Sequence, residues 1–208
     1  MGGLTAANLD AVTLDAYGTL VELDGHVERL QAALRVAGVD ADVTAIEHAW
    51  EVEVAYYADH KCLARDEVAL RTLRHECAQV FTQALGAAVE LTEAFTSAIV
   101  FRPLAGVLAA LEDLRARGLG LAVVSNWDCS LAGHLAAAGI HVDVVVTCAG
   151  AGVAKPSPEI FQQALARLGV SARRALHVGD QPEDEQGAKA AGMAFAPTPL
   201  PSVVSAWQ

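Results

Sequence analysis

The sequence predicts an α/β protein with one parallel β-sheet and a helical insert. Two observations carry this prediction. Short apolar segments rich in β-branched residues alternate with helical periodicity, as in parallel sheets that are covered on both faces. A stretch of about 100 residues without a strand pattern separates the first two apolar segments, and a single crossover helix would not need that length.

Four apolar segments are expected to form buried strands, because each is brief and lacks strict alternation of apolar and polar residues. They are residues 11–14, 121–124, 142–146 and 175–178. A polar residue stands at or just after the end of each one: Asp15, Ser125, Thr147 and Asp180. Ligands of open α/β sheets bind beyond the carboxyl ends of the strands, so these four side chains are expected to share one edge.

Helical periodicity accounts for much of the remaining chain. Apolar residues recur at i, i+3, i+4 and i+7 in the segments 104–114 and 160–168. In the long interval, one apolar helical face runs from Ile46 to Tyr57 and another from Leu73 to Ala84. These segments predict helices that cover the sheet and helices that pack on one another in the insert.

The domain organisation follows from the position of the insert. We predict a helical second domain at residues 22–100, over the strand ends, and a core made of residues 1–21 and 101–208. The proline-rich tail from residue 196 is expected to cover an edge of the sheet or to fray. The insert residues that are candidates to face the site are His26, Arg29, Trp50 and Tyr57.

Composition limits the partners of the chain. The net charge is −11, from 14 Lys and Arg against 25 Asp and Glu, and a field of that sign repels nucleic acid and anionic lipid. No apolar run is long enough to span a bilayer, and the first residues lack a signal-peptide pattern, so we expect a soluble cytoplasmic protein. The four cysteines form no C-x-x-C pair, which favours reduced, mostly buried thiols.

The polar residues after the strands are candidates for chemistry. Asp15 precedes a Gly-containing turn and is either a nucleophile or a turn cap. Ser125 and Asn126 either hold an anionic oxygen or form a turn. Lys155 stands directly before a Pro-Ser-Pro helix start, where it can neutralise the charge of a nucleophile and of its substrate.

Two further carboxylates, Asp180 and Asp184, follow the fourth strand. Together with Asp15 they would repel one another unless a cation binds, and oxygen ligands of this kind suit Mg²⁺. The alternative is an acidic helix N-terminus, which is electrostatically favourable by itself.

The order of these segments resembles the four motifs of the haloacid dehalogenase superfamily, from residue 12 to about residue 193. The stretches DAYGTL, VVSN, KPSPEIF and HVGD match it closely. The resemblance implies a Rossmann-like core with a helical cap, in which Asp15 is the nucleophile, Ser125 holds the anionic oxygen and Lys155 neutralises charge.

The resemblance also implies a magnesium site and further site residues. Asp180 would bind Mg²⁺ together with Asp15 and the backbone carbonyl of Tyr17, and Asp184 would support the site. Thr19 is placed with the catalytic residues. Trp127 follows Ser125 and Asn126 and either stacks on a ligand or packs the insert against the core, and we include it with Tyr17 among the substrate-binding candidates.

Two of the motifs indicate different chemistry. The superfamily's phosphatases carry a second aspartate two positions after the nucleophile, which serves as acid and base, and this chain has Tyr17 there. DAYGTL resembles the first motif of the metal-free 2-haloacid dehalogenases, whose halide leaves without a proton. Gly179-Asp180 resembles the phosphatases instead.

The leading hypothesis is a Mg²⁺-dependent phosphatase that acts on a small phosphorylated metabolite through an aspartyl-phosphate on Asp15. Its activity is expected to be weak or selective, because losing a general acid removes about 10² to 10⁴ in rate. A metal-independent 2-haloacid dehalogenase and a non-catalytic binding or regulatory protein are the alternatives. The substrate is expected to be a small anion, with no nucleic acid and no membrane as partner.

Overall fold

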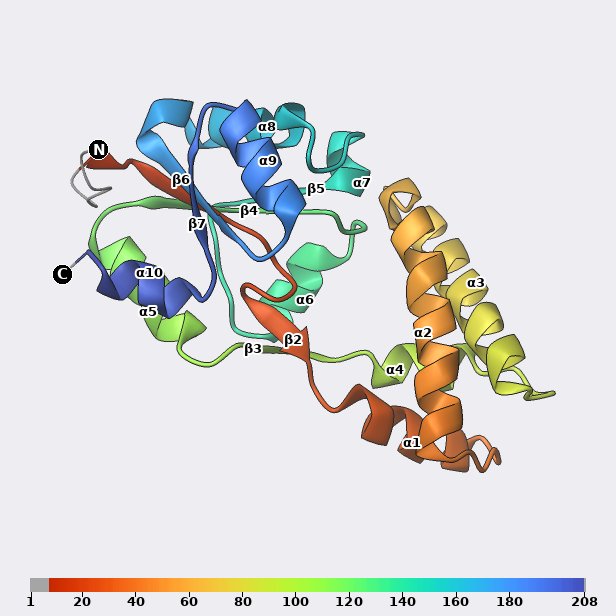
Figure 1. Ribbon diagram of the computed structural model, residues 1–208. Helices are drawn as coiled ribbons and strands as arrows, with labels where there is room; N and C mark the ends of the chain where they lie inside the picture. Colours follow the sequence, from red (N-terminus) through yellow and green to blue (C-terminus); the bar gives the residue numbers. More distant parts are fainter. Residues whose placement is uncertain (1–7, 208) are drawn as a thin grey trace.

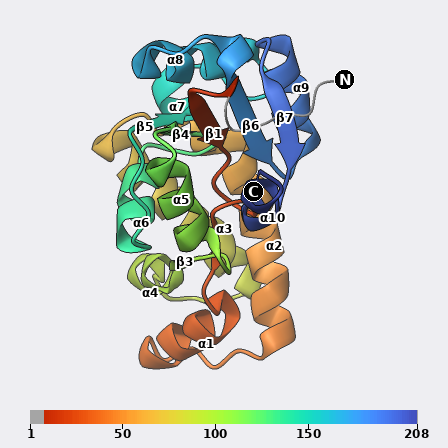
Figure 2. The same ribbon diagram turned by 90° about the vertical axis from the view of Figure 1, so that its left-hand side faces the viewer.

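The computed structural model describes residues 8–207 and contains a sheet of five parallel strands in the order β5-β4-β1-β6-β7 (Figure 1). Figure 2 shows the strands side by side in this order. Their bounds are β1 Ala11–Leu14, β4 Gly120–Ser125, β5 Val144–Thr147, β6 Ala175–Gly179 and β7 Ala194–Pro197. β1 lies at the centre, paired with β4 and β6. The predicted α/β fold with a Rossmann-like parallel sheet is confirmed.

The four predicted strands are present with slightly shifted ends, and β7 is an additional one. β7 ends in Pro197 and pairs with β6 alone, which fits the edge position where a strand tolerates proline. The expectation that the tail covers the sheet or frays was incomplete. The tail supplies the end of this strand and then helix α10 (Leu200–Ser205), whose Leu200 and Val204 are buried.

Helices cover both faces of the sheet (Figure 1). α5 (Val107–Ala116) and α10 lie on one face, while α8 (Pro158–Leu168) and α9 (Pro182–Ala190) lie on the other. α6 (Leu131–Ala137), α7 (Cys148–Ala151) and the short 3₁₀ helix η3 (Ala172–Arg174) complete the core.

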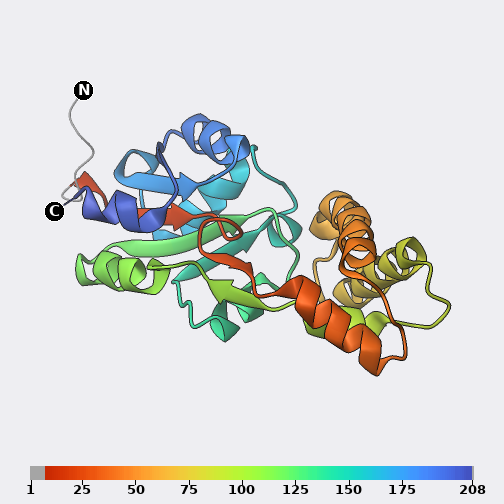
Figure 3. The ribbon, with the colours of Figure 1, turned by 60° about the horizontal axis from the view of Figure 1, so that its bottom comes forward.

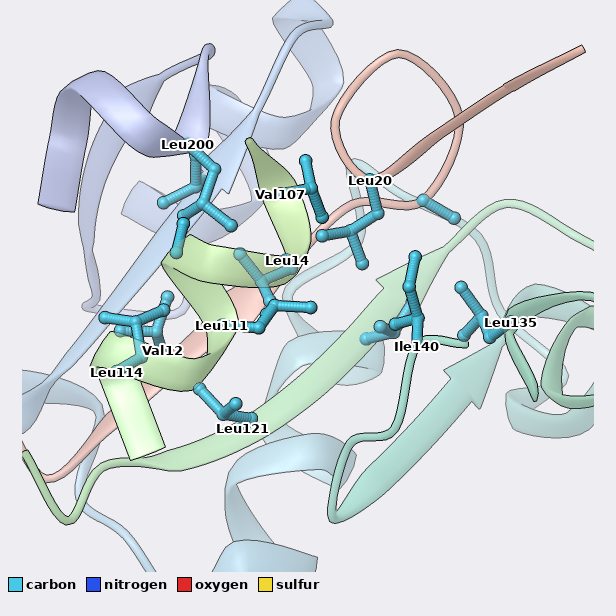
Figure 4. Packing of buried hydrophobic residues seen from close by; sticks show 14 of the residues in the cluster. Val12, Leu14, Leu20, Val107, Leu111, Leu114, Leu121, Leu135, Ile140 and Leu200 are labelled. Carbon is cyan, nitrogen blue, oxygen red and sulfur yellow. The ribbon is translucent and has the colours of Figure 1, made fainter. Parts of the chain in front are cut away.

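Each face of the sheet has its own hydrophobic cluster. The cluster under α5 and α10 includes Val12, Leu14, Leu111, Leu121 and Leu200 (Figure 4). The opposite cluster includes Ala11, Val124, Ile160, Phe161 and Ala164. Because successive residues of β1 enter opposite clusters, the strand is buried on both sides, and each large side chain contributes roughly 1.5–3 kcal/mol. This packing holds the end of β1 rigidly in place.

The remaining helices lie together at one end of the molecule (Figure 3). They are α1 (His26–Val36), α2 (Val43–His60), the 3₁₀ helix η2 (Lys61–Leu63), α3 (Glu67–Leu85) and α4 (Thr92–Ala98). Two short antiparallel strands, β2 (Val21–Leu23) and β3 (Phe101–Pro103), connect them to the core. The sequence pattern did not reveal these strands, because three residues are too few for a periodic signal.

The helices α1 to α4 enclose a separate buried cluster, which includes Leu30, Ile46, Leu73, Phe81 and Phe95. We propose that residues 22–100 act as a cap over the core, as the sequence predicts. Of the predicted core segment 1–21, residues 1–7 lie outside the described residues. Within the described range, no helix has the length and apolar character that crossing a membrane requires.

A disulfide bond joins Cys62 in η2 to Cys148 at the start of α7. The expectation of reduced thiols was therefore wrong for these two residues, while Cys77 and Cys129 are free. The two half-cystines are 86 residues apart in the sequence, and their Cα atoms lie 5.1 Å apart, within the range that a disulfide requires. No local pattern could indicate this pair, because only the folded chain brings the cap and the core together.

Removing the Cys62–Cys148 bond is expected to lower the free energy of unfolding. A bond that closes a loop of this length restricts the unfolded chain, so Cys62→Ser should cost about 2–4 kcal/mol. Denaturant unfolding with and without reductant measures the effect. Reductant should destabilise the wild type and the control Cys129→Ser, and should leave Cys62→Ser unchanged. Equal sensitivity of Cys62→Ser to reductant would contradict the assignment.

Candidate active site

The site begins at the turn that follows β1. Asp15 is almost fully buried, and its backbone N–H donates to the Val178 carbonyl at 2.9 Å. Gly18 in this turn has a φ of +81°, and a Cβ atom there would lie 2.7 Å from Oδ2 of Asp180. A side chain at position 18 would therefore force Asp180 away. Glycine at this position lets the carboxylate of Asp180 lie against the turn that carries Asp15.

Lys155 lies between two of the carboxylates. Its buried ammonium donates to Oδ1 of Asp15 and to Oδ1 of Asp184, both at 2.5 Å. The side chain of Asn126 holds the Lys155 backbone: Oδ1 accepts from Lys155 N at 2.7 Å, and Nδ2 donates to the Lys155 carbonyl at 3.1 Å. The Asn126 amide therefore positions Lys155, a contact that the sequence did not predict.

Asp184 is held by a chain of hydrogen bonds from β6 and β1. Its Oδ1 also contacts Nε2 of His177 at 3.1 Å, and its Oδ2 accepts from Gln181 N at 3.0 Å. Nδ1 of His177 contacts the Thr13 hydroxyl at 2.8 Å. Burial by itself would raise the pKa of Asp184. The hydrogen bond with His177 and the charge of Lys155 outweigh this effect and lower the pKa to about 2. Asp184 is therefore ionised at neutral pH, and His177 orients it.

The three carboxylates fit a divalent cation. One carboxylate oxygen from each of Asp15, Asp180 and Asp184 lies within 4.8 Å of the others. The pKa of Asp180 is raised by burial and by the negative charges of Asp15 and Asp184, although a hydrogen bond from Gln181 opposes this rise. Lys155 balances only one of the three charges, so the excess favours a hard cation such as Mg²⁺. Both oxygens of Asp184 are already hydrogen-bonded, which leaves Asp15 and Asp180 as the available ligands.

The other predicted site residues lie around this cluster. Ser125 is buried at the end of β4 and lines a cavity together with Asp15 and Lys155. Thr19 is buried in the turn after β1, and its hydroxyl has no hydrogen-bond partner among the described residues. Thr147, at the end of β5, accepts a hydrogen bond from Gly150 N and caps α7.

Tyr17 and Trp127 line the same cavity in different ways. Tyr17 is 50% exposed, and burial together with the charges of Glu22 and Asp180 raises its pKa. The phenol is therefore an even weaker acid than a free tyrosine. Trp127 is buried and packs edge-on against Phe101, with ring centroids 5.0 Å apart.

The cavity has a volume of about 680 Å³ and lies between the cap and the ends of the sheet strands. Trp50, Tyr57 and Phe95 supply its cap wall, so two of the insert residues suggested by the sequence reach it. The other two do not: His26 packs against Trp50, and Arg29 pairs with Asp24.

Several cavity residues were not among the predicted site residues, notably Glu53, Lys61 and Asp128. The hydroxyl of Tyr57 donates to Oδ2 of Asp128 at 2.9 Å, which joins the cap to the core. A sequence pattern could not identify this pair, because its members are 71 positions apart.

Comparison with known proteins shows which family model and which relatives this chain is similar to. The model of the haloacid dehalogenase-like hydrolase family matches residues 9–192. The "Haloacid dehalogenase-like hydrolase domain-containing protein 3" of Homo sapiens is 32% identical over 197 residues, which cover 88% of this chain and 78% of that protein. The protein of the same name from Mus musculus is 43% identical over 107 residues, which cover 50% of this chain and 43% of that protein. The chain thus spans about half the length of the mouse protein.

A phosphatase and a dehalogenase are also among the similar proteins. The phosphoserine phosphatase of Thermus thermophilus is 38% identical over 89 residues, which cover 41% of this chain and 36% of that protein. The structure of L-2-haloacid dehalogenase from Xanthobacter autotrophicus matches with a TM-score of 0.66 at 23% identity, covering 91% of this chain and 77% of that one. At this identity the structural likeness supports the fold alone.

Removing the charge of Asp184 is expected to destabilise the site. Asp184→Asn breaks a buried ion pair with Lys155 and should lower the free energy of unfolding by roughly 3 kcal/mol at neutral pH. Because the pKa of Asp184 is lowered to about 2 in the folded chain, its contribution is present above the unfolded pKa of about 3.9 and is lost as pH falls toward 2.

Denaturant unfolding between pH 7 and pH 2.5 or so measures this effect. The difference in the free energy of unfolding between the wild type and Asp184→Asn should shrink as the pH falls through that acidic range. The matched control on the same helix is Glu185→Gln, which breaks an exposed pair with Lys189 and should change stability by less than about 1 kcal/mol. An equal effect of the two substitutions would contradict the role of Asp184.

Proposed function

Since the chain belongs to the haloacid dehalogenase-like hydrolases, we propose that it is a Mg²⁺-dependent phosphatase of small phosphorylated metabolites. The observation that carries the proposal is the cluster of Asp15, Asp180 and Asp184, in which the buried ammonium of Lys155 pairs with Asp15 and Asp184 only. A site of this charge repels an anionic substrate unless a cation is bound. The similarity to a phosphoserine phosphatase supports the same chemistry.

In the first step, a carboxylate oxygen of Asp15 attacks phosphorus, and the bond from phosphorus to the leaving oxygen breaks. This produces an aspartyl-phosphate on Asp15. Lys155 holds Asp15 by a 2.5 Å hydrogen bond and places positive charge next to the phosphoryl oxygens. The hydroxyl of Ser125, which lines the same cavity, is our candidate to donate to one of these oxygens.

A bound Mg²⁺ would be held by Asp15, Asp180 and the Tyr17 carbonyl, and would supply positive charge that stabilises the phosphoryl group. Asp184 contributes by orienting Lys155. The second step is attack of water on phosphorus, which breaks the bond to Asp15 and releases phosphate.

The leaving group sets the limit of this chemistry. Tyr17 stands where an acid would protonate the leaving oxygen, and its raised pKa makes it a poor donor at neutral pH. An acyl or aryl phosphate needs no such proton, because its leaving oxygen is already acidic. We therefore propose that substrates with acidic leaving groups are hydrolysed best.

Metal-independent dehalogenation is the second candidate, and Tyr17 is the observation that favours it. Attack of Asp15 on the carbon of a 2-haloacid would release halide without a proton donor. Chloride release from 2-chloropropionate in the presence of EDTA would establish it. The carboxylates of Asp180 and Asp184 weigh against it, since without a cation they repel a carboxylate substrate.

Mg²⁺ binding tests the leading proposal directly. Calorimetric titration of the wild type should detect a Mg²⁺ site. Asp180→Asn should lose this site, because the substitution removes the most exposed carboxylate of the cluster. EDTA should abolish hydrolysis of 4-nitrophenyl phosphate, and Asp15→Asn should abolish it with Mg²⁺ present. Turnover that survives chelation would refute the metal-dependent mechanism.

Restoring an acid at position 17 should broaden the substrate range. Tyr17→Asp is expected to raise the rate on alkyl phosphates by about 10² to 10⁴, because their leaving oxygens need a proton. The rate on 4-nitrophenyl phosphate should change little. The control Tyr17→Asn has a similar shape but no proton to give, so an equal gain in both variants would contradict this explanation.

A further inference from the structure

The cap wall of the cavity contains a buried carboxyl group that the proposed mechanism does not use. Helix α2 turns Ile46, Ala49 and Glu53 toward the protein interior, so a glutamate occupies a position of the buried face. Glu53 is only 4% exposed and lines the cavity. Its surroundings therefore decide whether it is structural or binds a ligand.

Glu53 has no cationic partner within the part of the chain that the structure describes. No salt bridge among residues 8–207 includes it. Burial raises its pKa to about 7, and a hydrogen bond with the Cys77 thiol opposes this rise only in part. At a pKa of about 7 the group is partly ionised at neutral pH, and a cationic ligand next to it would favour the charged form.

The nearby cavity wall is aromatic. Trp50 and Tyr57 stand one turn before and one turn after Glu53 on α2, and Phe95 of α4 packs near Trp50 with ring centroids 6.0 Å apart. All three line the cavity. A carboxylate combined with aromatic rings is the arrangement that binds an ammonium group, through charge and cation–π attraction.

The cations of the cavity wall do not pair with Glu53. Among the described residues, neither Lys61 nor Arg74, which both line the cavity, forms a salt bridge with it. The Lys61 ammonium lies over the Tyr57 ring, 5.9 Å from its centroid. Burial lowers the pKa of Lys61, and the charges of Glu183, Asp15 and Asp128 oppose this shift. Trp50 and Phe95 are therefore the rings that are left for a ligand cation.

We propose that Glu53 is a specificity-determining residue that binds a protonated amino group on the far end of the substrate. The substrate class is a phosphomonoester with an apolar or aromatic body that separates the phosphate from the ammonium. Glu53 binds the ammonium between the aromatic rings, while the phosphate lies at Asp15 and Lys155. This inference rests on the proposed phosphatase function for the phosphate end only.

The test compares tyramine phosphate with 4-propylphenyl phosphate, in which a methyl group replaces the ammonium. Both have a similar aryl leaving group. The wild type with Mg²⁺ should favour tyramine phosphate by about 10- to 100-fold in kcat/KM, as expected for a hydrogen bond between charged groups. Glu53→Gln should bring the ratio close to one.

A second variant distinguishes a loss of ammonium binding from a loss of folding. Glu53→Leu suits the apolar face of α2, so it should fold and should favour 4-propylphenyl phosphate instead. A wild-type ratio close to one, or a preference for tyramine phosphate that persists in both variants, would overturn the role of Glu53.

Calorimetric titration with tyramine and 4-propylphenol separates this inference from the phosphatase proposal. If the wild type hydrolyses neither ester, the phosphatase proposal fails and binding decides the role of Glu53. Tyramine binding that Glu53→Gln and Glu53→Leu lose would support the ammonium site. Equal binding of tyramine and 4-propylphenol by the wild type would refute it.

Discussion

The site depends on the buried ammonium of Lys155, which donates to Asp15 and Asp184 at the edge of the sheet. Burying a lone cation costs several kcal/mol, and the two carboxylates offset this cost only in the geometry that the strands impose. Asp15 is carried by the end of β1, while Asp184 is oriented by His177 in β6. Asp15, Lys155 and β6 are therefore held as one unit, and Asp180 is the exposed carboxylate beside them.

The proposed cap supplies one wall of the cavity. Three links connect residues 57–64 to the core: the Cys62–Cys148 bond, the hydrogen bond of Tyr57 to Asp128, and the hydrogen bond of Cys129 N to the Ala64 carbonyl at 3.0 Å. All three involve the C-terminal end of α2 or the residues just after it. The end of the cavity next to Asp15 and Lys155 is thus linked to the core, and the Glu53 end is where we propose that selectivity arises.

The sequence predicted the strands that are buried on both faces, because continuous apolar runs are a strong signal. It missed β7, whose short segment contains a proline, and the pair β2 and β3, which are too short to show a period. It also missed how the groups are oriented. Asn126 was expected at an anionic oxygen, and its side chain instead holds the backbone of Lys155.

The sequence by itself determined the fold class, the family and the order of the polar residues along the strand ends, because each of these is encoded in a few adjacent residues. Only the tertiary structure decided which distant groups meet. The Cys62–Cys148 bond, the hydrogen bond of His177 to Asp184 and the position of Glu53 in the cavity all depend on how separate elements pack. Periodicity places a residue on a face of its own helix, whereas the opposing face is set by the fold.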